Sequence, residues 1–132
     1  MMRSAFLILV VALAGVSVVK AQDAAAQRAA VFRRDVAPFV KRFCVDCHGA
    51  KNPEGKFSFV GLGLTGDLAK PRELQVWQAV YEKLEGREMP PRDAEQPTEA
   101  ERAQVAKWLA TAIRAAGVVL DDGKWLAPIK GN

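Results

Sequence analysis

The pentapeptide Cys44-Val45-Asp46-Cys47-His48 contains both cysteines and the one histidine of the 132-residue chain. Two thiols three positions apart, followed directly by an imidazole, match the attachment sequence for c-type haem. The spacing lets the two sulfurs form thioethers with one porphyrin and brings the histidine under the iron. We therefore predict that Cys44 and Cys47 attach one haem c covalently and that His48 is an axial iron ligand through Nε2.

The other nitrogen of the His48 ring is expected to donate to a backbone carbonyl, which would fix the ring and its tautomer. Pro53 is the predicted acceptor. Three other interpretations of the pentapeptide are open. The first is a structural zinc site, which needs four ligands. Outside the pentapeptide the chain has no further Cys or His, so only carboxylates could complete the ligand set. A thioredoxin-like motif needs a preceding strand, whereas an amphipathic helix is predicted here. The third is a structural disulfide or a chance match.

Met89 is the predicted second axial ligand of the iron. It is the one thioether left once an N-terminal leader is removed, and it stands in Arg87-Glu88-Met89-Pro90-Pro91. The two prolines stiffen the backbone, and a rigid loop can hold a weak sulfur ligand. Ligation by Met and His raises the reduction potential and fills the sixth position of the iron. The alternative role is that of a methionine that fills a gap in the core.

An apolar stripe at helical spacing precedes the pentapeptide. Because proline is comfortable only in the first turn of a helix, the well-formed helix is expected to start near Ala37 or Pro38 and to run into Cys44. Residues 22–34 are expected to form a tether or a frayed helix. The stripe consists of Phe32, Val36, Phe39, Val40 and Phe43.

Two more helices are predicted further along the chain. One covers about residues 72–84 and stops at Gly86. The last opens with Thr98 as N-cap and Glu101 three residues later, a capping box, and closes at Gly117. Their apolar faces are Leu74, Trp77, Val80, Tyr81 and Leu84 in the first, and Val105, Trp108, Leu109, Ala112 and Ala116 in the second.

Glycine and proline dominate the segments between these helices. Residues 49–70 are predicted to form a long loop, and loops of this length inside a compact domain usually wrap something. Residues 61–66 also match GxGxxG, but a dinucleotide site would need a parallel sheet, so a tight loop against the haem edge is preferred. Residues 118–132 are expected to form a tail with a turn at 121–123, pinned by Trp125 and Leu126.

The N-terminus has the features of an export signal. A short basic start with Arg3 is followed by 15 apolar or small residues, Ala5 to Val19. A bilayer-spanning helix needs about 20 apolar residues, whereas the apolar part of a signal peptide has about 7–15. We predict cleavage after Ala21 and a periplasmic or extracytoplasmic location, with no membrane span in the mature protein. The alternative is an uncleaved anchor.

The chain is only mildly basic, with 19 Lys and Arg against 15 Asp and Glu. No basic stripe interleaved with aromatic residues is present, so nucleic acid is not an expected partner. Lys41, Arg42, Lys51 and Lys56 lie near the pentapeptide in sequence and are predicted to form a basic docking rim for an acidic redox protein. The length excludes doubly wound dehydrogenases and α/β barrels.

The pentapeptide, the later Met89 and the helix with Trp108-Leu109 resemble class I cytochrome c. More closely, residues from about 35 to 112 are similar to the Planctomycete-type cytochrome c domain. The shared residues are Val36-Ala37-Pro38, Phe43 to Gly49, Pro53-Glu54-Gly55, Trp77, Lys83-Leu84, Gly86, Glu88-Met89-Pro90-Pro91 and Trp108-Leu109.

The resemblance implies an all-α fold whose helices wrap around one covalently attached haem, with long Gly/Pro loops between them. It also implies that Cys44 and Cys47 are the attachment points and that His48 and Met89 are the axial ligands. The expected organisation is a signal peptide at 1–21, a tether at 22–34, a cytochrome c domain at 35–117 and a tail at 118–132.

The expected function is that of an electron carrier and not of an enzyme, because no acid/base or nucleophilic constellation accompanies the pentapeptide. The expected partners are redox proteins and the machinery that attaches haem to cytochromes c. Two alternatives were kept. One is a haem enzyme or gas-binding protein with a labile Met ligand, and the other is a haem subunit of a larger redox complex.

Overall fold

The computed structural model describes residues 20–62 and 64–120. This part of the chain contains helices and no strand, which confirms the predicted all-α class. Residues 20–31 are helical. The elements that follow are η1 (Phe32–Val36), α2 (Ala37–Phe43), η2 (Glu54–Lys56), α3 (Phe59–Leu62), α4 (Pro71–Glu85) and α5 (Glu99–Ala115).

The first helical segment is longer than predicted. It runs without interruption from residue 20 through η1 and α2 to Phe43, so the expected start near Ala37 or Pro38 is wrong. The ring of Pro38 conflicts with the carbonyl four residues before it in an α-helix. In η1 the Ala37 N–H donates to the Phe32 carbonyl, a wider π turn that accommodates the proline without ending the helix.

Tertiary contacts explain why residues 22–34 are ordered in a helix. The indole Nε1 of Trp108 donates to the carbonyl of Arg28, with 3.2 Å between the two atoms. Phe32 and Val36 are buried in the core. Packing against α5 therefore stabilises this segment, whose residues before Phe32 are mostly Ala, Gln and Arg and form no apolar stripe of their own.

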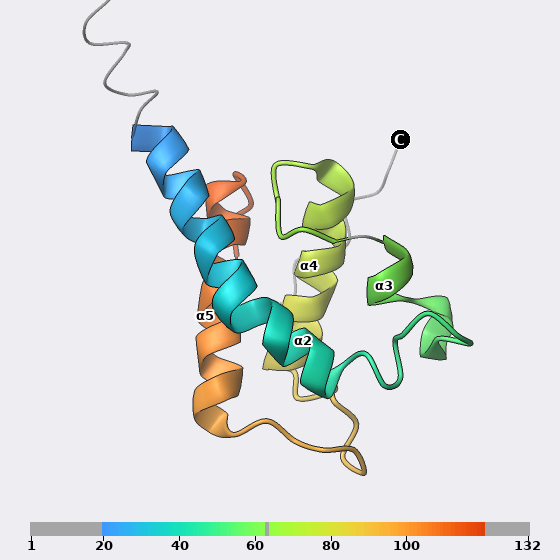
Figure 1. Ribbon diagram of the computed structural model, residues 1–132. Helices are drawn as coiled ribbons and strands as arrows, with labels where there is room; N and C mark the ends of the chain where they lie inside the picture. The colour runs from blue at the N-terminus through green and yellow to red at the C-terminus, as the bar shows by residue number, and fades with distance from the viewer. Residues whose placement is uncertain (1–19, 63, 121–132) are drawn as a thin grey trace, which may run out of the picture.

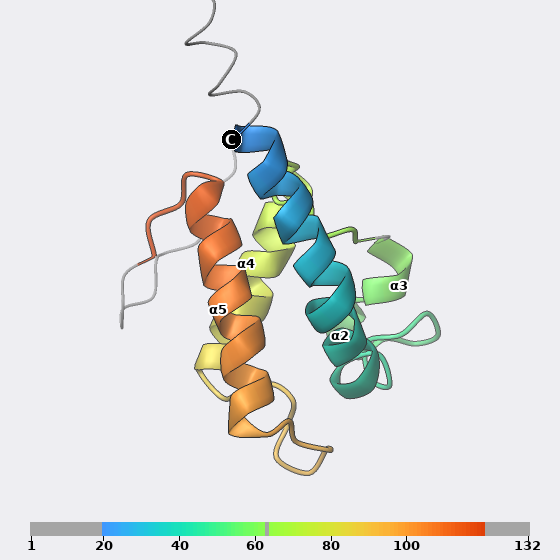
Figure 2. The ribbon, with the colours of Figure 1, turned by 60° about the vertical axis from the view of Figure 1, so that its left-hand side comes forward.

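Three helical segments form the body of the molecule. In Figures 1 and 2 the segment 20–43, α4 and α5 pack together, while α3 lies to one side, away from α5. The apolar faces of α4 and α5 meet, and both predicted helices are confirmed. Their buried residues are Trp77 and Leu84 in α4, and Val105, Ala106, Trp108, Leu109, Ala110, Ala112 and Ile113 in α5.

The ends of α5 follow the sequence prediction. The Thr98 hydroxyl accepts from the Glu101 N–H at 3.2 Å, and the Glu101 carboxylate accepts from the Thr98 N–H at 2.8 Å, which completes the capping box. Helix α5 ends at Ala115, and Gly117 follows with a φ of +87°. A glycine adopts this conformation without steric cost.

The long loop after α2 has little regular structure, as predicted, apart from the single turns η2 and α3. The leader residues 1–19 and the predicted turn and contacts of the tail at 121–132 lie outside the described residues. Within the described ranges, no helix has the length and the apolar character needed to cross a membrane.

Gly66 lets the loop between α3 and α4 approach the core closely. Its φ is +78°, and a Cβ built on it would lie 2.4 Å from Cδ2 of Phe32. Residues other than glycine rarely adopt this positive φ. In addition, real Cβ atoms essentially never lie so close to another atom. The last glycine of the GxGxxG pattern is therefore required for packing against Phe32. The described residues contain no sheet, which the dinucleotide interpretation would require.

Replacing Gly66 by Ala should lower the free energy of unfolding by at least about 2 kcal/mol, because the new methyl group meets the Phe32 ring and the positive φ is strained. Urea denaturation followed by far-UV circular dichroism measures the change. The control is Gly117→Ala, which shares a positive φ but has open space around the new Cβ, and should cost about 1 kcal/mol. Equal losses in both variants would show that packing on Phe32 contributes nothing.

Candidate metal centre

The two cysteines and the histidine lie in a tight turn that continues the end of α2. Cys44 N–H donates to Val40 O at 3.0 Å, and His48 N–H donates to Cys44 O at 2.8 Å. These bonds close successive helix-like turns and bring the residues of the pentapeptide together. Gly49 comes next, where a Cβ would lie 2.6 Å from the Val45 carbonyl oxygen, so a larger residue would force the turn open.

Both cysteines are free thiols in environments that differ. Cys47 is exposed, whereas Cys44 is half-buried under the end of α2. Burial, and to a lesser degree the neighbouring Cys47, raises the pKa of the Cys44 thiol to about 12. Cys44 is therefore a protonated thiol at neutral pH.

The His48 ring is held by one hydrogen bond. Its Nδ1 lies 3.1 Å from the carbonyl oxygen of Phe57. A carbonyl oxygen only accepts, so Nδ1 carries the proton and the lone pair of the neutral ring is on Nε2. Among the described residues Nε2 has no hydrogen-bond partner. This is the arrangement of a metal-ligating histidine whose orientation is fixed by a second group.

The predicted acceptor for His48, the carbonyl of Pro53, is wrong. That carbonyl accepts from the Lys56 N–H at 3.1 Å, inside the turn η2. The chain then turns back, so that Phe59 N–H donates to His48 O at 3.0 Å and the Phe57 carbonyl faces the ring. A contact nine residues along the chain depends on the path of this loop, which the sequence pattern did not specify.

Aromatic rings connect the candidate centre to the core. His48 meets Phe57 edge to face with 5.5 Å between ring centroids, and Phe57 meets Phe59 in the same way at 4.8 Å. Phe59 in turn lies 6.0 Å from Trp77 of α4. The partly exposed edges of Phe57 and Phe59 give the centre an apolar flank.

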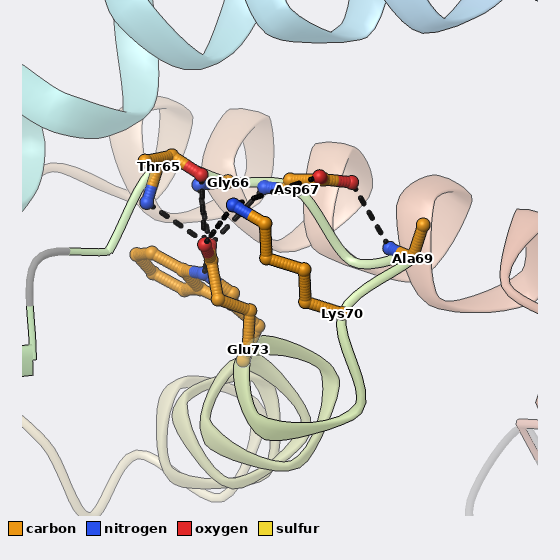
Figure 3. A network of polar contacts seen from close by, with 7 residues as sticks. Thr65, Gly66, Asp67, Ala69, Lys70 and Glu73 are labelled. Carbon is orange, nitrogen blue, oxygen red and sulfur yellow. Dashed lines mark hydrogen bonds and ion pairs between the residues drawn. The ribbon is translucent and has the colours of Figure 1, made fainter.

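The loop between this aromatic flank and α4 is fixed by the buried carboxylate of Glu73 (Figure 3). The carboxylate accepts from the N–H groups of Thr65, Gly66 and Asp67 at 3.0, 2.7 and 3.1 Å, and from the Thr65 hydroxyl at 2.7 Å. The Trp77 indole also donates to it, at 3.5 Å. One anion thus ties three consecutive residues of a glycine-containing loop to α4.

The pKa of Glu73 reflects two opposing effects. Burial by itself would raise it, because desolvation penalises the charged form. The hydrogen bonds from Thr65, Gly66 and Trp77 together outweigh burial, so the pKa lies below its usual range. Glu73 is therefore a permanent anion at neutral pH, and sequence reasoning missed it.

Met89 lies in the segment between α4 and α5, and its side chain is 38 % exposed. Its N–H donates to Lys83 O at 3.2 Å, and its carbonyl accepts from Arg102 at 2.9 Å. An exposed methionine does not fill a gap in the described core. The predicted helix stop at Gly86 is confirmed, and residues 87–98 form turns, bends and irregular backbone with no helix or strand.

An ion pair links the segment that carries Met89 to the end of α2, just before the cysteine turn. Arg42, two residues before Cys44, donates to Glu95 with 2.5 Å between Nη2 and Oε1. In both ribbon views the cysteine turn and the segment after α4 lie at the same end of the molecule (Figures 1 and 2). The tertiary structure thus brings the two predicted ligand segments to one end of the helices.

Two hollows on the described surface lie away from these residues. One, of about 530 Å³, is lined by residues of the N-terminal helical segment, the 65–69 loop and the last turns of α5. The other, of about 260 Å³, lies between α2 and α5. Neither is lined by the cysteine turn or by Met89, so the candidate centre is a surface turn with an aromatic flank.

The alternative sites find little support in the described residues. They contain no group of three or more His, Cys, Asp and Glu that could hold a metal ion, so the zinc alternative lacks a ligand set there. A helix and not a strand precedes the two cysteines, which removes the context of a thioredoxin-like motif. The thiols are not joined in a disulfide.

Comparison with known proteins gives one match. Residues 44–93 match the family model described as Planctomycete cytochrome C. No curated protein and no solved structure matches the chain significantly. The match confirms the predicted resemblance over a segment that starts at Cys44 and includes Met89. This segment is similar to a cytochrome c-type domain, and the similarity is consistent with a haem-binding electron-transfer protein.

Replacing Glu73 by Gln should destabilise the protein by about 1–3 kcal/mol at pH 7, because a charged acceptor of several hydrogen bonds is lost. Since folding lowers the pKa of Glu73, its contribution is present above the unfolded value of about 4.3 and is lost as the pH falls through the folded value. Urea midpoints of wild type and variant should therefore differ at pH 7 and approach each other as the pH falls below about 4.3 and through the lowered pKa of Glu73.

The matched control is Glu85→Gln, which neutralises an exposed carboxylate on the same helix. It should change stability by less than about 0.5 kcal/mol at either pH. A difference between wild type and Glu73→Gln that stays constant from neutral to acidic pH would contradict the assignment of Glu73 as a buried anion.

Proposed function

We propose that the protein is an exported monohaem c-type cytochrome that carries single electrons between redox partners. The observation that carries the proposal is the hydrogen bond between His48 Nδ1 and the Phe57 carbonyl, beside two free thiols. It leaves the Nε2 lone pair for a metal, on the histidine that ends the attachment motif. The residues present therefore suit a covalently attached haem c.

In this proposal each residue of the turn has its own task. Cys44 and Cys47 form the two thioethers, and the exposed Cys47 is the more accessible thiol. His48 provides Nε2 as one axial ligand, and the Phe57 carbonyl keeps the ring from rotating. Phe57 and Phe59 offer apolar surface to the porphyrin edge. Bound haem c supplies an iron that accepts and releases one electron at a time.

Met89 provides the second axial ligand in the proposal. Its thioether belongs to a segment whose backbone is tied to α4 through Lys83 and to α5 through Arg102. A sulfur ligand held in this way fills the sixth position and keeps small molecules from it. The chain then has no open coordination site, which suits a carrier better than an enzyme or a gas-binding protein.

Export and docking belong to the same proposal. The leader at 1–21 directs the chain to the periplasm or another extracytoplasmic space, where haem is attached. Lys41, Lys51 and Lys56 are exposed around the cysteine turn and form the basic rim for an acidic redox partner. Arg42, included in the rim predicted from sequence, is engaged by Glu95 and Glu101 and contributes less net positive charge.

The visible spectrum of the purified protein tests the haem and its ligands. We expect c-type bands in the reduced protein and the weak far-red band of ferric iron bound by a methionine sulfur. Met89→Leu, which replaces the thioether by an apolar side chain of similar volume, should keep the c-type bands and lose the far-red band. Carbon monoxide should bind the reduced variant and not the reduced wild type.

Each result has a distinct meaning. A protein without covalent haem would overturn the proposal as a whole. Haem bands without the far-red feature in the wild type, together with carbon monoxide binding, would favour the haem enzyme or gas-binding alternative. A stable co-purifying partner would favour the subunit of a larger redox complex.

The docking rim predicts how electron-transfer rates depend on salt. Oxidation by anionic ferricyanide should slow several-fold between about 0.01 M and 1 M salt, over which the Debye length falls from about 30 Å to 3 Å. Stopped-flow kinetics measures the rates. Lys41→Gln, Lys51→Gln and Lys56→Gln should each weaken this dependence, whereas Lys107→Gln, the same charge change on α5, should weaken it less. Rates indifferent to ionic strength would refute the basic rim.

A further inference from the structure

Arg102 is a buried cation on the apolar face of α5. Its side chain is 7 % exposed, and it stands three and seven residues before the buried Val105 and Leu109. Arginine is almost never buried without partners, because the guanidinium loses its hydration. An arginine on a core-facing stripe therefore marks a position where the fold needs a cation.

The partners of Arg102 all belong to one stretch of chain. Nη1 donates to the carbonyl of Met89 at 2.9 Å and to that of Leu84 at 3.3 Å. Nη2 donates to the side-chain oxygen of Gln96 at 3.2 Å, while Nε has no partner in the described structure. The Leu84 carbonyl lies at the negative end of the α4 dipole, which favours a cation. One guanidinium thus connects the end of α4, the backbone of Met89 and the side chain of Gln96, which lies three residues before α5.

Gln96 extends this brace through the proline-rich part of the segment. Its Nε2 donates to the carbonyls of Pro91, Ala94 and Pro90 at 2.7, 3.2 and 3.4 Å. Prolines have no N–H to donate, so the segment cannot be held by a ladder of its own backbone bonds. The side chains of Arg102, from α5, and of Gln96, further along the same segment, satisfy its carbonyls instead.

We propose that Arg102, supported by Gln96, is the positioning residue that keeps Met89 at the sixth coordination position of the iron. The inference rests on the proposed function, in which the Met89 thioether is a ligand. A thioether is a weak ligand, so the folded chain has to hold it close to the iron. Arg102 binds the backbone carbonyl of the same residue that carries the sulfur, and its loss releases Met89 from α5.

Imidazole binding to the ferric holoprotein tests the proposal. Imidazole enters only when Met89 has left, so its apparent affinity reports the fraction of molecules with an open sixth position. In Arg102→Gln the far-red band should weaken and the apparent Kd of imidazole should fall at least about tenfold, because charge-assisted hydrogen bonds to the Met89 segment are lost. Far-UV circular dichroism establishes that the variant is folded during the titration.

A matched control comes from the same segment. Arg87 forms an ion pair with Glu99 of α5, with two N–O distances of 2.7 Å, on side chains that are 64 % and 72 % exposed. Arg87→Ala therefore removes an arginine that also joins this segment to α5, but at the surface. Exposed ion pairs contribute little, so the imidazole Kd should change less than about twofold.

The outcomes separate the two proposals. A wild type that shows c-type bands without the far-red band overturns Met89 ligation itself. A wild type with the band, and an Arg102→Gln variant with an unchanged imidazole Kd, overturns the positioning role and leaves Arg102 as a residue for stability only. Should Arg102→Gln fail to fold, Gln96→Ala decides: a lower Kd supports the brace, and an unchanged Kd overturns it.

Discussion

The packing of Phe32 holds the described structure together. Its ring meets Trp77 edge to face and lies against Trp108, with 5.4 Å between centroids in each case, and Gly66 packs on its other atoms. These residues come from the first helical segment, α4, α5 and the loop before α4. Through these two ring contacts Phe32 joins all three helical segments, and the placement of the loops at their ends follows from that arrangement.

Two buried side chains of opposite charge stabilise the loops on either side of α4. Glu73 accepts hydrogen bonds from the N–H groups of residues 65–67. Arg102 donates hydrogen bonds to backbone carbonyls at the end of α4 and in the segment that follows it. Loops rich in glycine and proline form few backbone bonds of their own, so side chains from a neighbouring helix satisfy their polar groups. A buried ion with several such partners is stable because its lost hydration is replaced.

This construction suits an electron carrier. The turn with Cys44, Cys47 and His48 continues α2 directly, and the segment with Met89 is tied to α4, to α5 and, through Arg42 and Glu95, to the end of α2. In the proposed function, ligands held from several sides would move little between oxidation states, which would favour fast electron transfer, and the same fixation would keep the Met89 thioether in place.

The sequence determined those features of the structure that depend on interactions between residues close together in the chain. The cysteine motif, the capping box of α5, the stop of α4 at Gly86 and the apolar faces of α4 and α5 were all predictable, because each depends on residues a few positions apart. The similarity of residues 44–93 to the Planctomycete cytochrome C family was also recognisable from its motifs.

Contacts between distant segments decided the remainder. The helix over 20–43 persists because Trp108 and the core stabilise it from α5 and because a π turn accommodates Pro38. The acceptor of His48 is Phe57 and not Pro53, since the loop turns back on the histidine. Arg102 could have been noticed as a charge on an apolar stripe, but its partners could not, because hydrogen bonds to backbone carbonyls carry no signature in the sequence. The sequence by itself determined which residues are the candidates for the chemistry, because the motif is local, and only the tertiary structure decided which groups hold them in place.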